Sequence, residues 1–239
     1  MDRESLLQAD RILSDTKAHA RYYSETFQIP FEKFRNLYLG SDETLFCPQM
    51  NLLPPKTFTV FTYSSYMPLH GVDIIVDAAY RCQSLPIRFR IIGDQGPTYN
   101  SVQAKAKQCR LTNIDFVPYT PYKELPNEIG QASLCLGGHF GSSVKASRVI
   151  AGKTYQFVAM KKPVILGDNL ANKELFQHKQ NAYLVKQNDP EELAQAISTL
   201  YADPALCQSL ANHAYKLFDE QLSWAKLETT LVETIKSCF

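Results

Sequence analysis

Short apolar runs alternate with amphipathic segments along most of this 239-residue chain, and this alternation limits the possible folds more than any other feature. After residue 56 the runs are rich in β-branched and aromatic residues, which favour strands. The predicted strands are 57–63, 88–92, 114–117, 133–136, 163–166 and 182–185. The predicted helices are 72–82, 99–109, 122–130, 154–160, 173–177 and the segments that begin at Asp189 and Asp203. This order predicts an α/β domain with a doubly wound, mostly parallel sheet of the Rossmann-like kind.

The chain before this domain has a different pattern, and a linker separates the two. Helices at 2–10 and 17–27 and a strand at 34–39 are predicted there, with Asp15 or Thr16 as the cap of the second helix. The segment 47–56 contains three prolines, which indicates a linker. We therefore expect an N-terminal part over 1–50, a main domain over 51–222 and a final helix over 223–239.

Composition excludes several classes of protein. The apolar fraction of 45 % is enough for a sizeable core, and a net charge of +1 gives no electrostatic case for binding nucleic acid or an anionic membrane. The six cysteines are scattered and form no CxxC pair, which argues against a zinc site and a disulfide framework. No apolar run reaches the roughly 18 residues of a membrane span, and the N-terminus lacks a signal peptide. We expect a cytoplasmic protein, with any membrane contact being peripheral.

The loop at 137–153 follows a predicted strand, enters a helix and is the strongest candidate for a binding site. It combines glycines, hydroxyl groups, one histidine and three cations, Lys145, Arg148 and Lys153. Glycine lets backbone N–H groups approach an anion, and a helix N-terminus adds partial positive charge. Lysine and arginine supply further counter-charge for a phosphate. The alternative is a flexible, solvated surface loop.

Two other strand ends carry weaker signals. His70-Gly71 starts a helix after the first strand of the main domain, so it is either a tight turn or a backbone N–H and imidazole placed near a phosphate. The segment 93–96 is compatible with an ordinary turn. The chain contains no GxGxxG after that first strand, no Walker loop, no nucleophile elbow and no HExxH motif. The missing GxGxxG argues against a dinucleotide dehydrogenase.

Several segments taken together resemble one known family. They are Tyr63-Ser-Ser-Tyr-Met-Pro-Leu-His-Gly-Val-Asp73, Phe89-Arg-Ile-Ile-Gly-Asp94, Lys153-Thr-Tyr-Gln-Phe-Val-Ala-Met-Lys-Lys-Pro-Val-Ile-Leu-Gly-Asp168, Asn181-Ala-Tyr-Leu-Val185 and Asp189-Pro-Glu-Glu-Leu-Ala194. In this order and spacing they look like the C-terminal half of the retaining GT-B glycosyltransferases of family 4, the glycosyl transferases group 1. Residues 2–46 look like the last elements of that family's N-terminal, acceptor-binding domain, and 223–239 like the helix that returns to it.

The resemblance implies that the chain binds a nucleotide-diphosphate sugar as donor substrate, with no metal and no other cofactor. The positions that would contact this donor are Gly138, His139, Phe140, Gly141, Lys145, His70, Gly71, Gln156, Val117 and Tyr119. The run 138–141 falls where the family contacts the sugar, the run 117–119 where it contacts the base, and Gln156 where it has a ribose-binding Glu. Lys153, with Arg148, is expected to stabilise the leaving diphosphate.

Departures from the family pattern leave alternatives open. The neutral Gln156 replaces a carboxylate, and Ser64 and Ser65 stand where a basic residue is often found. Only the tail of the acceptor domain is recognisable, so a partner chain or missing segment is expected to supply the rest. One alternative is a non-catalytic partner subunit or degenerate half. Another is nucleotide-sugar 2-epimerisation, for which the relevant loops offer mainly Asp94 and Asp168. The base, the sugar and the acceptor stay undetermined, and polysaccharide, lipid-linked glycan and small-molecule acceptors are all open.

Overall fold

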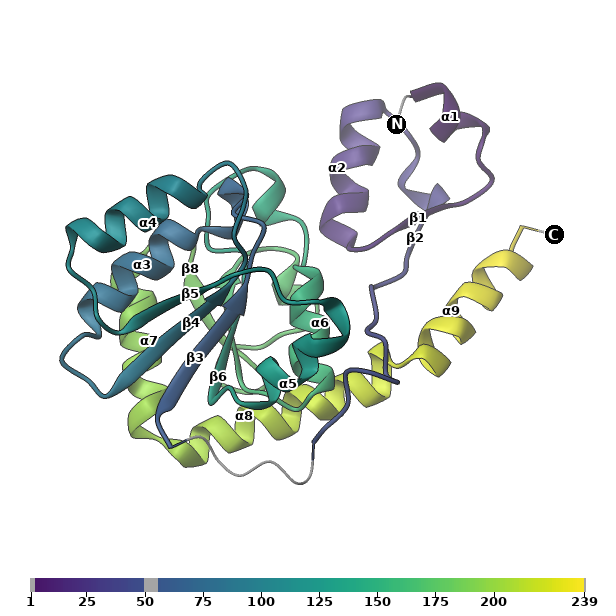
Figure 1. Cartoon of the computed structure of the whole chain (residues 1–239). Helices are drawn as coiled ribbons and strands as arrows, with labels where there is room; N and C mark the ends of the chain where they lie inside the picture. The colour runs from purple at the N-terminus through teal and green to yellow at the C-terminus, as the bar shows by residue number, and fades with distance from the viewer. Residues whose placement is uncertain (1–2, 50–55, 239) are drawn as a thin grey trace.

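The strand order of a six-stranded parallel sheet reverses at the centre of the molecule, as the computed structural model in Figure 1 shows. The structure describes residues 3–49 and 56–238. The strands are β3 (Phe58–Tyr63), β4 (Ile87–Ile92), β5 (Ile114–Val117), β6 (Leu134–Gly138), β7 (Val164–Asp168) and β8 (Tyr183–Lys186), in the order β5-β4-β3-β6-β7-β8. All neighbouring pairs run parallel. This is the doubly wound order, and it confirms the predicted Rossmann-like α/β fold.

Helices cover both faces of the sheet. One face packs mainly against α3 (Val72–Arg81), α4 (Tyr99–Gln108) and α7 (Pro190–Ala202), and the other against α5 (Leu125–Gly130), α6 (Gly152–Ala159) and α8 (Pro204–Leu217). Successive strand residues alternate between the two cores: Val60 belongs to the first and Phe61 to the second. Because both faces are buried, the strands read as nearly continuous apolar runs in the sequence.

The N-terminal part forms a small unit of its own. It contains α1 (Arg3–Gln8), β1 (Ile12–Ser14), α2 (Lys17–Phe27) and β2 (Phe34–Asn36), and its two strands pair in parallel. The Thr16 hydroxyl caps α2 by accepting from the His19 amide, as predicted. The Glu174 carboxylate from the main domain accepts from the amides of Lys17 and Ala18 at 2.8 and 2.7 Å. A carboxylate at a helix N-terminus is stabilising, so this contact fixes the unit beside the sheet. The predicted boundary at residues 50–51 lies outside the described residues.

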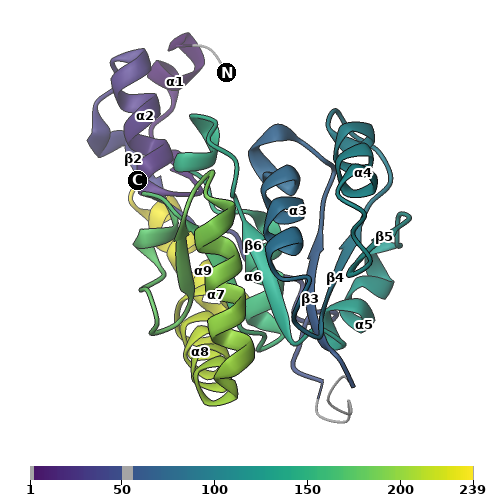
Figure 2. The same cartoon turned by 90° about the vertical axis from the view of Figure 1, so that its left-hand side faces the viewer.

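The C-terminus returns to the same unit. A π-helical turn (Phe218–Leu222) connects α8 to α9 (Trp224–Lys236), which extends away from the main domain. In Figure 2 the end of α9 lies below the N-terminal unit, and the Arg11 guanidinium donates to the Ser237 carbonyl at 3.3 Å. Trp224 and Ile235 on α9 are about half exposed, at 52 % and 51 %.

One local prediction was wrong, and the strand predicted at 133–136 extends further than expected. The predicted helix at 173–177 is a single 3-10 turn (Asn172–Glu174). The 137–153 segment is not a solvated loop throughout, because β6 extends to Gly138 and residues 137–141 and 149–151 are buried. The glycines allow this close packing: a Cβ on Gly141 would lie 2.3 Å from the Pro68 carbonyl oxygen, and one on Gly71 would lie 2.5 Å from the Gly141 nitrogen. The loops after β3 and β6 therefore touch backbone to backbone.

This packing predicts that Gly141→Ala lowers the free energy of unfolding by about 1–3 kcal/mol, the usual cost of overpacking. Gly152→Ala is the matched control, because a Cβ there meets no described atom within 4 Å. Urea unfolding of both variants checks this. Equal stability of the two would contradict the close approach of the two loops.

Candidate functional site

A pocket of about 980 Å³ opens at the carboxyl ends of the strands, where the strand order reverses between β3 and β6. Ligands of doubly wound folds bind at such a reversal of strand order. The lining comes from the loops after β3, β4, β5 and β6 and from the first turns of α6. The N-terminal unit and the segment after it contribute Asp15, His19, Leu39 and Gly40. The pocket therefore lies between the main domain and the N-terminal part.

The Lys153 amine is buried in the pocket wall. Its side chain is only 6 % exposed, and Nζ donates to the Thr62 hydroxyl at 2.8 Å and the Tyr63 carbonyl at 3.0 Å. Burial lowers the pKa of Lys153 to about 7. Lys153 is also in the first turn of α6, whose N-terminus has no side-chain cap among the described residues. A buried amine and uncapped helix amides thus meet at one wall of the pocket.

A pair of stacked histidines lies beside Lys153. The rings of His70 and His139 are 5.5 Å apart between centroids and 7° from parallel. His70 follows β3 and shares a 2.8 Å hydrogen bond between its Nδ1 and the Ser64 hydroxyl, whereas His139 follows β6. Burial, reinforced by the Lys153 charge, lowers the pKa of His70 to about 4 and that of His139 to about 3. Both imidazoles are therefore neutral near pH 7.

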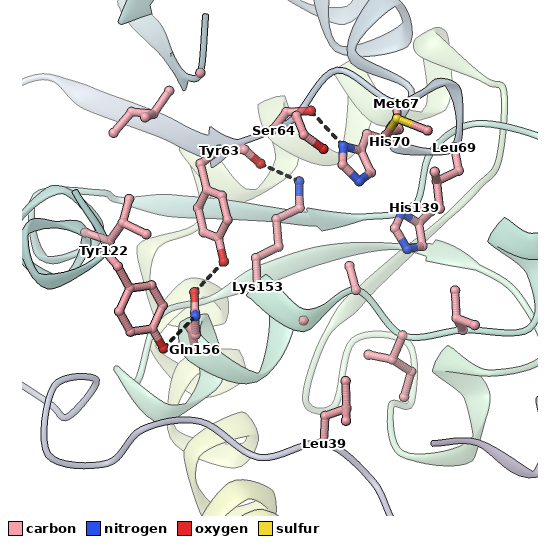
Figure 3. Close-up of a pocket in the computed structure, with 18 of the residues that line it drawn as sticks. Leu39, Tyr63, Ser64, Met67, Leu69, His70, Tyr122, His139, Lys153 and Gln156 are labelled. Atoms are coloured by element: carbon pink, nitrogen blue, oxygen red, sulfur yellow. Dashed lines mark hydrogen bonds between the residues drawn. The ribbon is translucent and has the colours of Figure 1, made fainter. Parts of the chain in front are cut away.

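Tyrosines and a glutamine form the opposite end of the pocket. The Tyr63 hydroxyl donates to the Gln156 carbonyl oxygen, and the Gln156 amide donates to the Tyr122 hydroxyl at 3.5 Å. Burial raises the pKa of Tyr63, so this hydroxyl stays a donor. Figure 3 shows Lys153 between this cluster and the histidine pair. Sequence reasoning did not select Tyr63 or Tyr122, although both lie at the ends of predicted elements.

The predicted site residues fall into two groups. Those that line the pocket are His70, Tyr119, His139, Lys145, Lys153 and Gln156. Those that the structure does not place in its lining are Gly71, Val117, Gly138, Phe140, Gly141 and Arg148. Phe140 is part of the core, and Gly71 and Gly141 make the backbone contact between the two loops. The Arg148 guanidinium stacks on the Tyr22 ring of α2 at 3.3 Å.

A comparison with protein families identifies the chain. The model of the family described as glycosyl transferases group 1 matches residues 47–217, which include every element of the six-stranded sheet. The chain belongs to the glycosyl transferases group 1 family. No curated protein sequence matches it.

Solved glycosyltransferase structures share the fold. A glycosyltransferase from Rickettsia africae superposes with a TM-score of 0.81 at 16 % identity, covering 97 % of this chain and 64 % of that one. HepE from Anabaena, in complex with UDP and glucose, gives a TM-score of 0.83 at 17 % identity, with coverages of 99 % and 68 %. Sucrose-phosphate synthase from Thermosynechococcus elongatus superposes with a TM-score of 0.79 at 17 % identity, covering 98 % of this chain and 60 % of that one. The Rossmann-like domain is thus the C-terminal half of a GT-B fold, and this group 1 chain spans less than two thirds of the Rickettsia africae protein.

The described residues form neither a membrane-spanning helix nor a metal cluster. No helix among residues 3–49 and 56–238 has the length and apolar character needed to cross a membrane. Over the same ranges, no three His, Cys, Asp or Glu side chains gather as a metal site would require.

The two stacked imidazoles, of which His139 is buried and His70 half-buried, predict how stability depends on pH. Their pKa values in the folded protein lie below the ordinary value of about 6.5, so the unfolded chain binds more protons. Their contribution is therefore present above pH 6.5 and is lost as the pH falls from 6.5 towards 4. Urea unfolding at several pH values should show that, between pH 6.5 and 4, a His70→Asn/His139→Asn variant loses less free energy of unfolding than the unaltered chain. The exposed His213→Asn serves as control, and equal losses in all three proteins would contradict the burial of the pair.

Proposed function

We propose that this chain binds a nucleotide-diphosphate sugar in the pocket and serves as the donor half of a retaining glycosyltransferase. The observation that carries the proposal is the Lys153 amine, buried at an uncapped helix N-terminus where the strand order reverses. Amide groups and a cation together form a site for a phosphate group. Membership of the group 1 family and the UDP complexes among the structural neighbours support the same ligand class.

In this proposal the two ends of the pocket hold different parts of the donor. The nucleoside lies at the Tyr63, Gln156 and Tyr122 end, where Tyr119 offers an exposed ring to a base and Gln156 can donate to or accept from the ribose. The sugar lies at the other end, towards the Lys145 amine. The diphosphate between them meets Lys153 and the first amides of α6. The open space at Gly152 leaves room for that approach.

Catalysis in this proposal is electrostatic. The bond between the sugar and the diphosphate breaks as the acceptor oxygen bonds to the same carbon from the same face, and the acceptor hydroxyl proton passes to an oxygen of the leaving phosphate. Negative charge grows on the leaving diphosphate before this proton arrives. Lys153 and the α6 amides are placed to stabilise that charge in a partly buried site, where such interactions are strongest. They supply this counter-charge from the protein itself, so we propose that neither a metal nor an organic cofactor takes part. Arg148 takes part only if its side chain leaves the Tyr22 ring.

We further propose that an acceptor-binding domain completes the small sheet of the N-terminal unit. A parallel sheet is normally buried inside a larger one, whereas β1 and β2 pair only with each other among the described strands. The Leu13 side chain of β1 is 46 % exposed. Further strands beside β1 would cover it and place an acceptor opposite the donor pocket. A cytoplasmic location fits such an enzyme, because nucleotide sugars are found there.

Thermal unfolding with UDP-, ADP- and GDP-sugars tests the donor assignment. One nucleotide class should raise the midpoint, because a ligand that binds only the folded state stabilises it. Lys153→Met keeps the apolar stem and removes the charge. It should weaken binding about 10- to 100-fold, as expected for loss of a charged hydrogen bond.

The matched control is Lys107→Met, which removes an exposed cation of α4 outside the pocket lining and should leave affinity unchanged. No shift with any nucleotide sugar would contradict the proposal and favour a non-catalytic partner subunit. Unchanged donor affinity in Lys153→Met would contradict the assignment of Lys153 as a phosphate contact.

A further inference from the structure

His139, which is buried, and His70, which is half-buried, are titratable groups that the electrostatic mechanism leaves without a role. They come from loops after two different strands, and the reversal of strand order brings them together. Both line the pocket, and they lie next to Lys153 in Figure 3. We propose that this histidine pair takes up one proton when the diphosphate binds, so that it becomes a second cationic contact only in the occupied site. This inference rests on the proposed function.

The hydrogen bonding of the pair is incomplete in the free protein. His139 is only 5 % exposed, and within the described part of the chain its Nδ1 atom has no hydrogen-bond partner. An unsatisfied buried polar atom is costly and indicates a missing partner. Nδ1 of His70 is occupied by the Ser64 hydroxyl, which leaves its Nε2 for a ligand. Phosphate oxygens are acceptors, and a protonated imidazole donates from both nitrogens.

Burial, and after it the surrounding positive charges, keep the empty pair neutral. Lys153 on α6 and Lys145 beyond β6 are cations whose charges disfavour protonation of His139. The carboxylates in the lining are already engaged elsewhere: Asp94 accepts from the Tyr119 amide at 3.2 Å, and Asp15 is hydrogen-bonded to His19 at 2.8 Å. A diphosphate diester brings two negative charges beside the rings, which favours the imidazolium. Two parallel imidazoliums repel each other, so the pair takes up one shared proton.

The sign of the pH effect follows from linkage. In the free protein the pKa values of His70 and His139 are about 4 and 3, whereas beside the diphosphate the pair returns to at least its ordinary value of about 6.5. Between those limits binding takes up a proton, so affinity falls as the pH rises, by about tenfold per pH unit. Lys153, with a pKa of about 7, gives a separate proton uptake above that pH. The two effects therefore occupy different pH ranges.

Isothermal titration calorimetry measures the proton directly. UDP-glucose, ADP-glucose and GDP-mannose keep the charge of their diphosphate diester over this range, so protons taken up come from the protein. Titrations at pH 5.5 in buffers of different ionisation enthalpy should give an uptake close to one proton per bound ligand. A His70→Asn/His139→Asn variant should bind with an uptake near zero and with about tenfold lower affinity at pH 5.5. The exposed His213→Asn control should behave as the unaltered chain.

The outcomes separate the two proposals. Binding without proton uptake at pH 5.5, or uptake that persists in the double variant, overturns the proposed protonation of the histidine pair. It does not contradict the proposed donor site. Absence of binding by all three nucleotide sugars between pH 5.5 and 8 overturns both. If the double variant does not fold, the ring resonances of His70 and His139 in the unaltered chain decide by NMR. They should move to their protonated positions at pH 5.5 when ligand is added, and unchanged resonances would overturn the inference.

Discussion

The amine of Lys153 is buried where the strand order of the sheet reverses, between β3 and β6. Burying an ammonium is unfavourable unless it is paired or hydrogen-bonded. Here two acceptors at the end of β3, the Thr62 hydroxyl and the Tyr63 carbonyl, offset part of that cost. The part of the burial cost that these acceptors do not offset lowers the pKa of Lys153. An anion in the pocket would remove this cost, which is the reason for our proposal that a phosphate binds here.

The rest of the pocket is built from neutral groups around this amine. The histidines are uncharged near pH 7, and the sequence resemblance puts Gln156 in place of a carboxylate and Ser64 and Ser65 in place of a frequent basic residue. Such a pocket has a low density of fixed charge for a diphosphate site. If the negative charge of the ligand causes the histidine pair to take up a proton, the positive charge that balances the diphosphate is completed only on binding. This gives the departures from the family pattern one common physical explanation.

The sheet could be predicted from the sequence because its strands are short apolar runs buried on both faces. The limits of β5 were predicted to the residue, and Lys153 was selected from its place at a strand-to-helix loop. Other features depend on contacts between distant segments. Arg148 was expected at the diphosphate, but the position of its side chain is set by Tyr22 on a separate unit. The Tyr63–Gln156 hydrogen bond joins residues 93 positions apart, and no local pattern indicates it.

The most direct test of the account is a crystal structure of the chain with a nucleotide sugar bound. We predict that a phosphate oxygen lies within hydrogen-bonding distance of Lys153 Nζ and of the first amides of α6, with the base towards Tyr119 and Tyr122. A ligand bound elsewhere, or one in the pocket while Lys153 still donates only to Thr62 and Tyr63, would contradict the central role given to this amine.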